Sequence, residues 1–235
     1  MTIHGCRSCF FCGKKEIFQH IKRNNIKRRS ASFFEVRVAQ KKMNYYTSDL
    51  HFGQQSLLAN GKWHERPFTS VQEMNEELIK RWNKKITNAD HVYILGDVGS
   101  RGVWNMHPEC LAKLKGNKHL IIGNHDDVTD LRIRQLFIEI CDYKELSDNQ
   151  NGTNQKLVLS HYPIMMWNGQ HRGSILLYGH LHNSIEEELF QKYLTMFNED
   201  RKPMDGEQLC RAYNVGACLW NYEPVSLHEI LMRSV

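Results

Sequence analysis

The sequence predicts a layered α/β fold whose functional site lies where its strands end. Five short apolar runs, typical of strands, each end directly on a cluster of polar residues, and helical segments separate several of them. Alternating strands and helices are typical of α/β domains, and ligand sites in such domains form at the carboxyl ends of the strands. The chain has 235 residues, 41% of them hydrophobic, which is enough for one domain core with a small appendage.

The predicted strands are short and rich in β-branched and aromatic residues. The clearest is the run His-Val-Tyr-Ile-Leu at 91–95, which stops at Gly96-Asp97. Another is the run Ile-Leu-Leu-Tyr at 175–178, which stops at Gly179-His180. The full set is 45–48, 91–95, 120–122, 157–160 and 175–178, with 213–215 and 225–227 as closing strands.

Four helical segments are expected between these strands. The first begins at Ser70, because Glu73 follows three residues later and completes a capping box. Its apolar residues recur at helical spacing and predict one buried face, formed by Val71, Met74, Leu78, Trp82 and Ile86. The other segments are expected from Pro108 to Gly116, around 131–140 and over roughly 184–198.

Residues 1–43 differ in composition from residues 44–235, so we predict an N-terminal extension followed by one domain. The extension holds 11 of the 31 Lys and Arg residues but 2 of the 26 Asp and Glu residues, a net charge of +9, whereas the rest of the chain carries −4. The extension is expected to be solvated and disordered. Two alternatives are a zinc site using Cys6, Cys9 and Cys12, which would need a fourth ligand, and a basic arm that touches nucleic acid.

The chain lacks the features of a membrane or secreted protein. No apolar run approaches the roughly 18 residues that span a bilayer, and no apolar stretch near the N-terminus precedes a cleavage site. The seven Cys residues are odd in number, and four of them are widely scattered, which favours reduced thiols over a disulfide framework. We therefore expect a cytoplasmic protein with no membrane partner, and the sequence leaves its oligomeric state open.

The polar clusters at the strand ends contain the side chains that bind divalent transition metals. Imidazole, carboxylate and amide donors suit Mn, Fe or Zn, and no thiolate belongs to the set. Two clusters pair their candidates two residues apart, a spacing that places side chains on one face of an extended strand. The candidates are Asp49, His51, Asp97, Asn124, His125, His161, His180 and His182.

In their order along the chain, these clusters resemble the motifs of the calcineurin-like metallophosphoesterases. The blocks are Asp49-x-His51, Gly96-Asp97, Gly123-Asn124-His125-Asp126, His161 and Gly179-His180-x-His182, and they span residues 45–182. The resemblance implies a four-layer αββα sandwich, in which two mixed β-sheets are flanked by helices. It leaves residues 1–43 outside the family domain.

The resemblance also implies a role for each residue. One divalent ion would be held by Asp49, His51 and His182, a second by Asn124, His161 and His180, and both by Asp97. A hydroxide between the two ions would attack the phosphorus of a phosphate mono- or diester, for example a nucleotide, and His125 would assist the leaving group. The alternatives are a nuclease that uses the basic N-terminal arm and a metal-bound scaffold without catalysis.

One position departs from part of the family. Ser100 stands where protein phosphatases have the Asp that orients the catalytic His, so the residue that orients His125 is left unassigned. The next residue, Arg101, occupies a position that makes it a candidate phosphate contact. Three further substrate contacts are predicted from their place between ligand clusters, namely Arg66, His171 and Arg172.

Overall fold

A computed structural model describes residues 42–58, 66–100, 106–150, 153–201 and 204–233 of the chain. The chain divides into residues 1–38 and 39–235, and every described element belongs to the second unit. The predicted N-terminal extension, with its candidate zinc and nucleic-acid sites, lies outside the described residues apart from positions 42 and 43. The boundary at residue 43 therefore stays a prediction.

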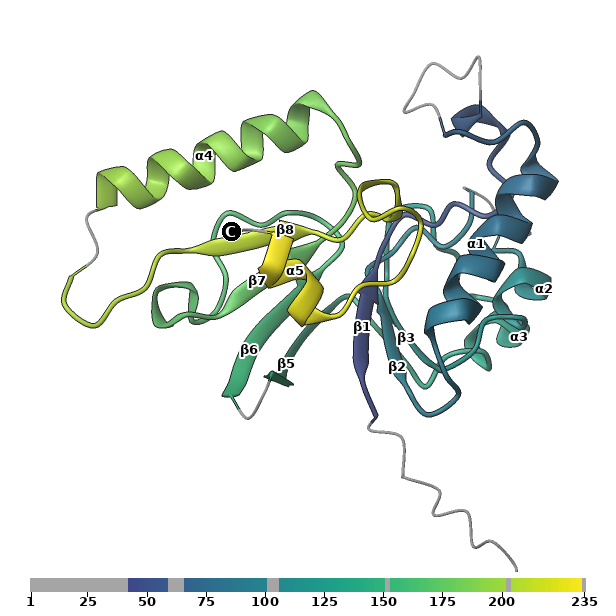
Figure 1. The fold of residues 1–235 in the computed structure, drawn as a ribbon, viewed down its shortest axis with the longest axis horizontal. Coiled ribbons are helices and arrows are strands. Elements are labelled where there is room, and N and C mark those ends of the chain that lie inside the picture. The colour runs from purple at the N-terminus through teal and green to yellow at the C-terminus, as the bar shows by residue number, and fades with distance from the viewer. Residues whose placement is uncertain (1–41, 59–65, 101–105, 151–152, 202–203, 234–235) are drawn as a thin grey trace, which may run out of the picture. The chain divides into compact units, whose positions relative to one another are not determined.

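The described unit contains two four-stranded sheets (Figure 1). The strands of the first are all parallel and follow chain order: β1 (Asn44–Thr47), β2 (His91–Ile94), β3 (Asn117–Ile121) and β4 (Glu139–Cys141). The second sheet is mixed, because β5 (Tyr143–Gln150) runs antiparallel to β6 (Thr153–Ser160). Its other pairs are parallel and join β6, β7 (Ile175–Tyr178) and β8 (Arg211–Asn214).

The helices cover the outer faces of the sheets. In Figure 1, α1 (Val71–Lys85), α2 (Pro108–Leu111) and α3 (Leu131–Arg134) lie beside the first sheet, and α4 (Ile185–Arg201) runs along the second. The chain ends in α5 (Leu227–Arg233), which contacts β1 and β5. Three short 3₁₀ helices complete the described elements, at Gln55–Leu57, Gln170–Arg172 and Ala217–Leu219. None of the described helices is long and apolar enough to cross a membrane.

Three separate clusters of buried side chains define four layers. Because successive side chains of a strand point to opposite faces, Val92 and Ile94 pack under α1 whereas Tyr93 packs between the sheets. In the second sheet, Leu157 faces the space between the sheets and Val158 faces α4. The clusters are therefore helix on sheet, sheet on sheet, and sheet on helix, which confirms the predicted αββα sandwich. The expectation of two mixed sheets is corrected, because the first sheet is entirely parallel.

Helix α1 begins as its sequence predicts. The Ser70 side chain accepts a hydrogen bond from the backbone N–H of Glu73 at 3.1 Å, which satisfies one of the free donors of the first turn. The Glu73 carboxylate reaches back to the backbone N–H of Thr69 at 2.7 Å, one residue earlier than a standard capping box requires. Met74, Leu78 and Trp82 are buried on the predicted face.

Several predicted elements need correction. The helix expected around 131–140 ends at Arg134, and Glu139–Cys141 is instead the edge strand β4. The helix from Pro108 ends at Leu111, and the strand expected at 225–227 is reduced to a single bridge between Val225 and Tyr46 before α5 begins. Strand β5 was not predicted, because its polar sequence has no apolar run, although it pairs with the next strand along the chain, β6.

Candidate metal centre

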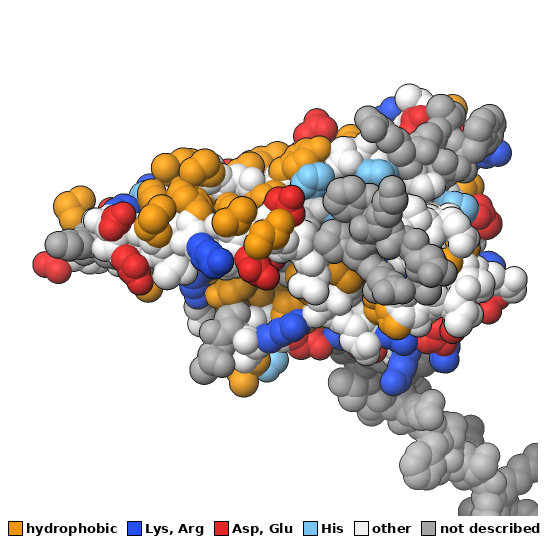
Figure 2. Space-filling view, turned by 90° about the horizontal axis from the view of Figure 1, so that it is seen from above, with side chains coloured by type: hydrophobic (Ala, Val, Ile, Leu, Met, Phe, Trp, Pro, Cys, Tyr) orange, Lys and Arg blue, Asp and Glu red, His pale blue; other side chains and the backbone are white. Residues whose placement is uncertain are grey.

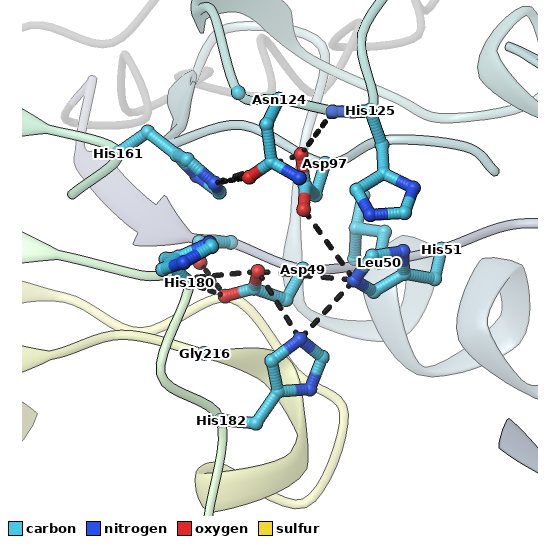
Figure 3. Close-up of polar contacts among 12 residues, drawn as sticks. Asp49, Leu50, His51, Asp97, Asn124, His125, His161, His180, His182 and Gly216 are labelled. Atoms are coloured by element: carbon cyan, nitrogen blue, oxygen red, sulfur yellow. Dashed lines mark hydrogen bonds and ion pairs between the residues drawn. The ribbon is translucent and has the colours of Figure 1, made fainter. Parts of the chain in front are cut away.

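The carboxyl ends of five strands bring the predicted ligands together. Parallel strands place these ends at one edge of each sheet, and the two edges meet at the same end of the sandwich. Figure 3 shows the resulting cluster, in which side chains from both sheets point toward one another. It contains all eight residues: Asp49, His51, Asp97, Asn124, His125, His161, His180 and His182.

Within the cluster, one group of donors comprises Asp49, His51 and His182. The Nε2 atoms of the two histidines are 3.2 Å apart, and their rings stack with centroids 5.1 Å apart. The Asp49 Oδ1 atom is 3.5 Å from His182 Nε2 and 3.8 Å from His51 Nε2. Three donor atoms therefore converge on one point from β1 and β7, although their positions in the chain are far apart.

A second group comprises Asp97, His161 and His180, with Asn124 beside it. One ligand atom from each of the first three lies within 4.8 Å of the others. The Asn124 Oδ1 atom is 3.0 Å from His161 Nε2, and the Asp97 Oδ1 atom is 3.6 Å from the same nitrogen. This group joins the ends of β2, β3, β6 and β7.

Asp97 lies between the two groups and presents a different oxygen to each. Its Oδ2 atom is 3.7 Å from His51 Nε2 in the first group. Its Oδ1 atom is 3.6 Å from His161 Nε2 in the second and accepts a hydrogen bond from the backbone N–H of His125 at 2.8 Å. A carboxylate in this position can bridge two cations.

The spacing of the donor atoms fits metal ions. Nitrogen and oxygen ligands at about 2.0–2.2 Å from one ion in tetrahedral geometry are about 3.5 Å from one another. The separations of 3.2, 3.5 and 3.8 Å in the first group and 3.6 Å in the second are close to this value. The donors are nitrogen and oxygen atoms, which suit Mn, Fe and Zn alike.

The burial of charge supports the same interpretation. Burial raises the pKa of the Asp49 carboxyl above its ordinary value, and burial likewise raises that of Asp97. Burial lowers the pKa of His51 well below its ordinary value, and it also lowers that of His180. Neutral imidazole nitrogens beside buried carboxylates are a poor balance of charge without a cation, and they are the protonation states that bind a metal.

The backbone at the site adopts a left-handed conformation that residues other than glycine rarely take. Five of the candidate ligands have φ between 50° and 69°: Asp49, His51, Asp97, His180 and His182. Such left-handed residues cost energy and concentrate at functional sites, where the surrounding structure holds them. The pairs Asp49/His51 and His180/His182 therefore lie in tight turns after β1 and β7, and the extended geometry predicted from their spacing is wrong.

Glycines allow these turns to approach one another closely. A Cβ atom on Gly123 would come within 2.3 Å of Asp97 Oδ1 and 2.6 Å of the Asp97 backbone nitrogen. A Cβ atom on Gly179 would come within 1.8 Å of the Ser48 hydroxyl oxygen. Any side chain at either position would push the ligand loops apart.

A surrounding set of hydrogen bonds orients the candidate ligands. The Nδ1 atoms of His51 and His161 lie 3.2 Å from the carbonyl of Gly99 and 2.8 Å from that of Leu95, which leaves each Nε2 atom to face the cluster. Such partners fix the ring orientation and tautomer of a ligating histidine. The Asp49 carboxylate accepts hydrogen bonds from the Ser48 hydroxyl and from the backbone N–H of His180.

Asp126 is a supporting residue that the sequence did not single out, although it stands within the Gly-Asn-His-Asp motif. Its Oδ2 atom accepts hydrogen bonds from the backbone N–H groups of Asp97 and Gly123, at 3.0 and 2.8 Å. Its Oδ1 atom accepts from the N–H of Val98 at 2.8 Å. One carboxylate therefore joins the loop after β2 to the loop after β3, and burial raises its pKa.

Asn214 is a second supporting residue that was missed. It lies at the end of β8, where its side chain donates to the His182 carbonyl at 3.2 Å and to Glu187 of α4 at 2.9 Å. Its Oδ1 atom accepts from the backbone N–H of Gly216 at 2.8 Å. No local pattern identifies this role, because two of its three partners, His182 and Glu187, lie about 30 residues earlier in the chain.

His125 lines the pocket beside the two ligand groups. Its backbone N–H is tied to Asp97, and the edge of its ring meets the His51 ring at a centroid distance of 5.2 Å. Its Nδ1 atom is buried and has no hydrogen-bond partner among the residues that the structure describes. Within that part of the chain, His125 is positioned by packing against His51 and by the hydrogen bond from its own backbone N–H to the Asp97 carboxylate, and no carboxylate bonds to its Nδ1 atom.

The predicted substrate contacts do not gather at this site. Arg66 is 1% exposed, and its guanidinium donates to the carbonyls of Leu50 and Asp49 at 2.7 and 2.6 Å, so it supports the ligand loop from behind. His171 and Arg172 precede β7, whereas the ligands follow it, so they lie at the opposite end of that strand. The prediction that these three residues reach the pocket needs this correction, and Arg101 lies outside the described residues.

The pocket over the metal centre has a volume of about 140 Å³. Beside six of the eight cluster residues, it is lined by Gln54, Ser56 and Leu57 from the turn after β1. No Lys or Arg is among the described residues that line it.

Comparisons with known proteins agree with the fold and the order of the motifs. The chain is 32% identical over 189 residues to an uncharacterised protein of Methanocaldococcus jannaschii, covering 80% of this chain and 88% of that protein. It is 27% identical over 164 residues to the gene 66 protein of Mycobacterium phage D29, covering 60% and 79%. A crystal structure of a protein of unknown function from Aquifex aeolicus matches with a TM-score of 0.56 at 22% identity, covering 83% of this chain and all of that one. Residues 45–220 match the family model of the calcineurin-like phosphoesterases, and the chain belongs to this family.

Proposed function

We propose that the protein hydrolyses phosphate mono- or diesters with two divalent metal ions. The observation that carries the proposal is the position of Asp97, whose two oxygens face separate groups of donors at 3.7 and 3.6 Å. Asp49, His51 and His182 would hold one ion, and Asn124, His161 and His180 the other. Mn, Fe and Zn remain equal candidates, since the donor set accepts each of them.

When bound, the two ions would supply the positive charge and the activated water that hydrolysis of a phosphate ester requires. The residues of the chain would do the positioning. The two turns that carry Asp49 and His180 are held by the hydrogen bond between them, and Asp126 fixes the turn of Asp97. Phosphoryl transfer depends mainly on such positioning and on charge neutralisation.

His125 is proposed as the proton donor to the leaving oxygen. It lines the pocket, and its backbone is tied to the bridging carboxylate at 2.8 Å. An imidazole can exchange a proton near neutral pH, which is the property that a general acid requires. With Ser100 in place of an orienting carboxylate, the tautomer of His125 would be set when substrate binds.

The test is hydrolysis of p-nitrophenyl phosphate and bis(p-nitrophenyl) phosphate by protein reconstituted with Mn, Fe or Zn. We expect metal-dependent release of nitrophenol that a chelator abolishes. Asp97→Asn should lower kcat/KM at least about a thousandfold, since metal ions supply several kcal/mol of transition-state stabilisation. Asp205→Asn, at an exposed carboxylate outside the centre, is the matched control.

Two outcomes would overturn the proposal. Folded Asp97→Asn protein with wild-type activity would show that the centre is not the catalyst. Protein that binds two ions per chain but cleaves no phosphate ester would favour the alternative of a metal-bound scaffold.

A further inference from the structure

Tyr162 stands directly beside the metal centre but belongs to neither ligand group. Its ring centroid lies 4.9 Å from that of His161 and 4.5 Å from that of His180, both in edge-to-face arrangement. His180 in turn lines the pocket over the centre. The His180 side chain therefore lies between the Tyr162 ring and the pocket in which a phosphate would bind.

Despite these contacts, 47% of Tyr162 is exposed to solvent. Tyr46 and Tyr178, which also contact other rings, are fully buried in the core. Two further apolar side chains of the same loop, Met165 and Met166, are 57% and 62% exposed. In Figure 2, hydrophobic side chains cover the side of the molecule on which α4 lies, and they reach as far as the exposed histidines.

An exposed apolar patch at the edge of a polar site is typical of a surface that contacts a ligand. Methionine is frequent at such surfaces because its side chain adapts to different shapes. The described lining of the pocket contains no Lys or Arg, so the part of a substrate outside the phosphate has no cation to pair with there. Tyr162, Met165 and Met166 can contact that part of a substrate through their apolar surfaces.

We propose that Tyr162 selects substrates by stacking on an aromatic base carried by the phosphate ester, so that the substrate class is nucleoside phosphates. Stacking suits this role because every nucleobase has an apolar face, and an exposed tyrosine loses little conformational freedom when it binds. Pro163 favours an extended backbone at Tyr162, which limits the directions in which its side chain can leave the chain. This inference rests on the proposed function, because it requires a phosphate at the metal centre.

The alternative is that Tyr162 only supports the rings of His161 and His180. The two roles differ in what they do to matched substrates. A supporting residue would affect every phosphate ester equally, because its loss would disturb the metal ligands. A residue that stacks on a base would affect only substrates that carry one.

The experiment therefore compares substrates that differ only in an aromatic base. For a diesterase, the pair is thymidine 5′-(p-nitrophenyl phosphate) and 2-deoxyribose 5-(p-nitrophenyl phosphate), which share their sugar and their leaving group. For a monoesterase, the pair is thymidine 5′-monophosphate and 2-deoxyribose 5-phosphate, assayed by phosphate release. Each pair is measured with metal-loaded full-length protein carrying Tyr162→Ala, Tyr162→Phe, or Ile138→Ala, which truncates an exposed apolar side chain just before β4.

We expect wild-type protein to prefer the base-containing substrate of the pair that it cleaves. Tyr162→Ala should reduce that preference about tenfold, mainly through KM, whereas Tyr162→Phe and Ile138→Ala should retain it. An equal loss on both substrates, or hydrolysis of p-nitrophenyl phosphate without cleavage of either base-containing substrate, would overturn the role of Tyr162. No hydrolysis of any ester, p-nitrophenyl phosphate included, would instead reject the proposed function, and this inference with it.

Discussion

The Asp126 carboxylate accepts a hydrogen bond from the backbone N–H of Asp97 at 3.0 Å, so one acid holds the main chain of another that faces both ligand groups. Asp126 also accepts from Gly123 and Val98, and these contacts join the loops after β2 and β3. All three bonds come from backbone N–H groups. The distance between the Asp97 loop and the Asn124 loop therefore depends on a residue that is not itself a candidate ligand.

Asp126→Asn should loosen both loops. The amide nitrogen of Asn cannot accept a hydrogen bond, so at least one of the three backbone donors loses its partner, at a cost of about 1–3 kcal/mol. We expect a lower free energy of unfolding by urea denaturation and a weaker second metal site by calorimetry. Asp127→Asn, which alters a carboxylate bonded to Thr129, is the control and should leave metal affinity unchanged. Unchanged affinity in Asp126→Asn would contradict this role.

Arg66 should act on stability and on the first ligand loop. Its guanidinium is buried and donates to the carbonyls of Leu50 and Asp49. Arg66→Met would leave both acceptors without this donor, and each unsatisfied buried group costs about 1–3 kcal/mol. We expect a decrease of about 2–5 kcal/mol in the free energy of unfolding, measured by urea denaturation of the metal-free protein.

Arg81→Met is the matched comparison for Arg66→Met. Arg81 is a partly exposed cation whose guanidinium lies 5.7 Å from the ring of Tyr222, the same ring that Arg66 contacts at 5.5 Å. Its loss should cost about 1 kcal/mol or less, since contacts of exposed cations are weak. Equal destabilisation by both variants would show that the buried carbonyl contacts of Arg66 contribute little.

Removal of single ligands should change the metal content in a defined way. His182→Ala removes a donor of the first group alone, so we expect the bound metal to fall from two ions per chain to one by mass spectrometry of dialysed protein. Asp97→Asn should weaken both sites. Each ion present at a hundred times its dissociation constant should add about 2.7 kcal/mol to stability. The metal-induced rise in melting temperature should therefore be smaller in His182→Ala than in wild-type protein, and smaller still in Asp97→Asn. Two tightly bound ions in His182→Ala would contradict the assignment.

His119 should make the protein less stable in mild acid. It lies at the amino end of the first sheet, 7% exposed, with its Nε2 atom 2.7 Å from His91 Nδ1. Burial lowers the pKa of His119, and burial likewise lowers that of His91, below the ordinary value of about 6.5. The folded state therefore binds protons less readily than the unfolded chain. The stability that these neutral histidines contribute is fully present above about pH 6.5 and falls as the pH decreases below that value.

The test is urea denaturation of metal-free protein between pH 7.5 and 5, with and without His119→Gln. The wild-type protein should lose up to about 1.4 kcal/mol per pH unit for each histidine involved. The variant should show a shallower loss, because one of the histidines whose pKa is lowered by burial is gone. Parallel curves for the two proteins would exclude a contribution from His119.

The two ligand pairs illustrate how much of the site could be predicted from sequence. Asp49-x-His51 and His180-x-His182 were identified because their residue types and order carry the chemistry of metal binding. Their geometry was not predicted, since all four residues adopt positive φ in turns beyond the strand ends. Local propensity does not favour such strained backbone, and contacts from distant parts of the chain hold it, as the bond from His180 to Asp49 shows.

The helices and strands likewise divide into those that the local sequence predicted and those that it did not. α1 was predicted because its cap and its apolar period are local, whereas β4 was missed because its pairing depends on β3, earlier in the chain. Strand β5 pairs with the adjacent β6 and was missed because its polar sequence has no apolar run. Arg66 shows the limit most clearly: a charged residue beside a ligand cluster was expected to face the substrate, but tertiary packing buries it behind the loop.

The sequence by itself determined the layered α/β class, the identities of the eight candidate residues and the donor chemistry that they offer. These features are set by residue type, period and order, which need no knowledge of distant contacts. Only the tertiary structure decided which donors share a point in space, that Asp97 faces both groups, and that Asp126, Asn214 and Tyr162 stand around them. The reason is physical: separations of about 3–4 Å between residues up to 133 positions apart arise only when both sheets have packed together.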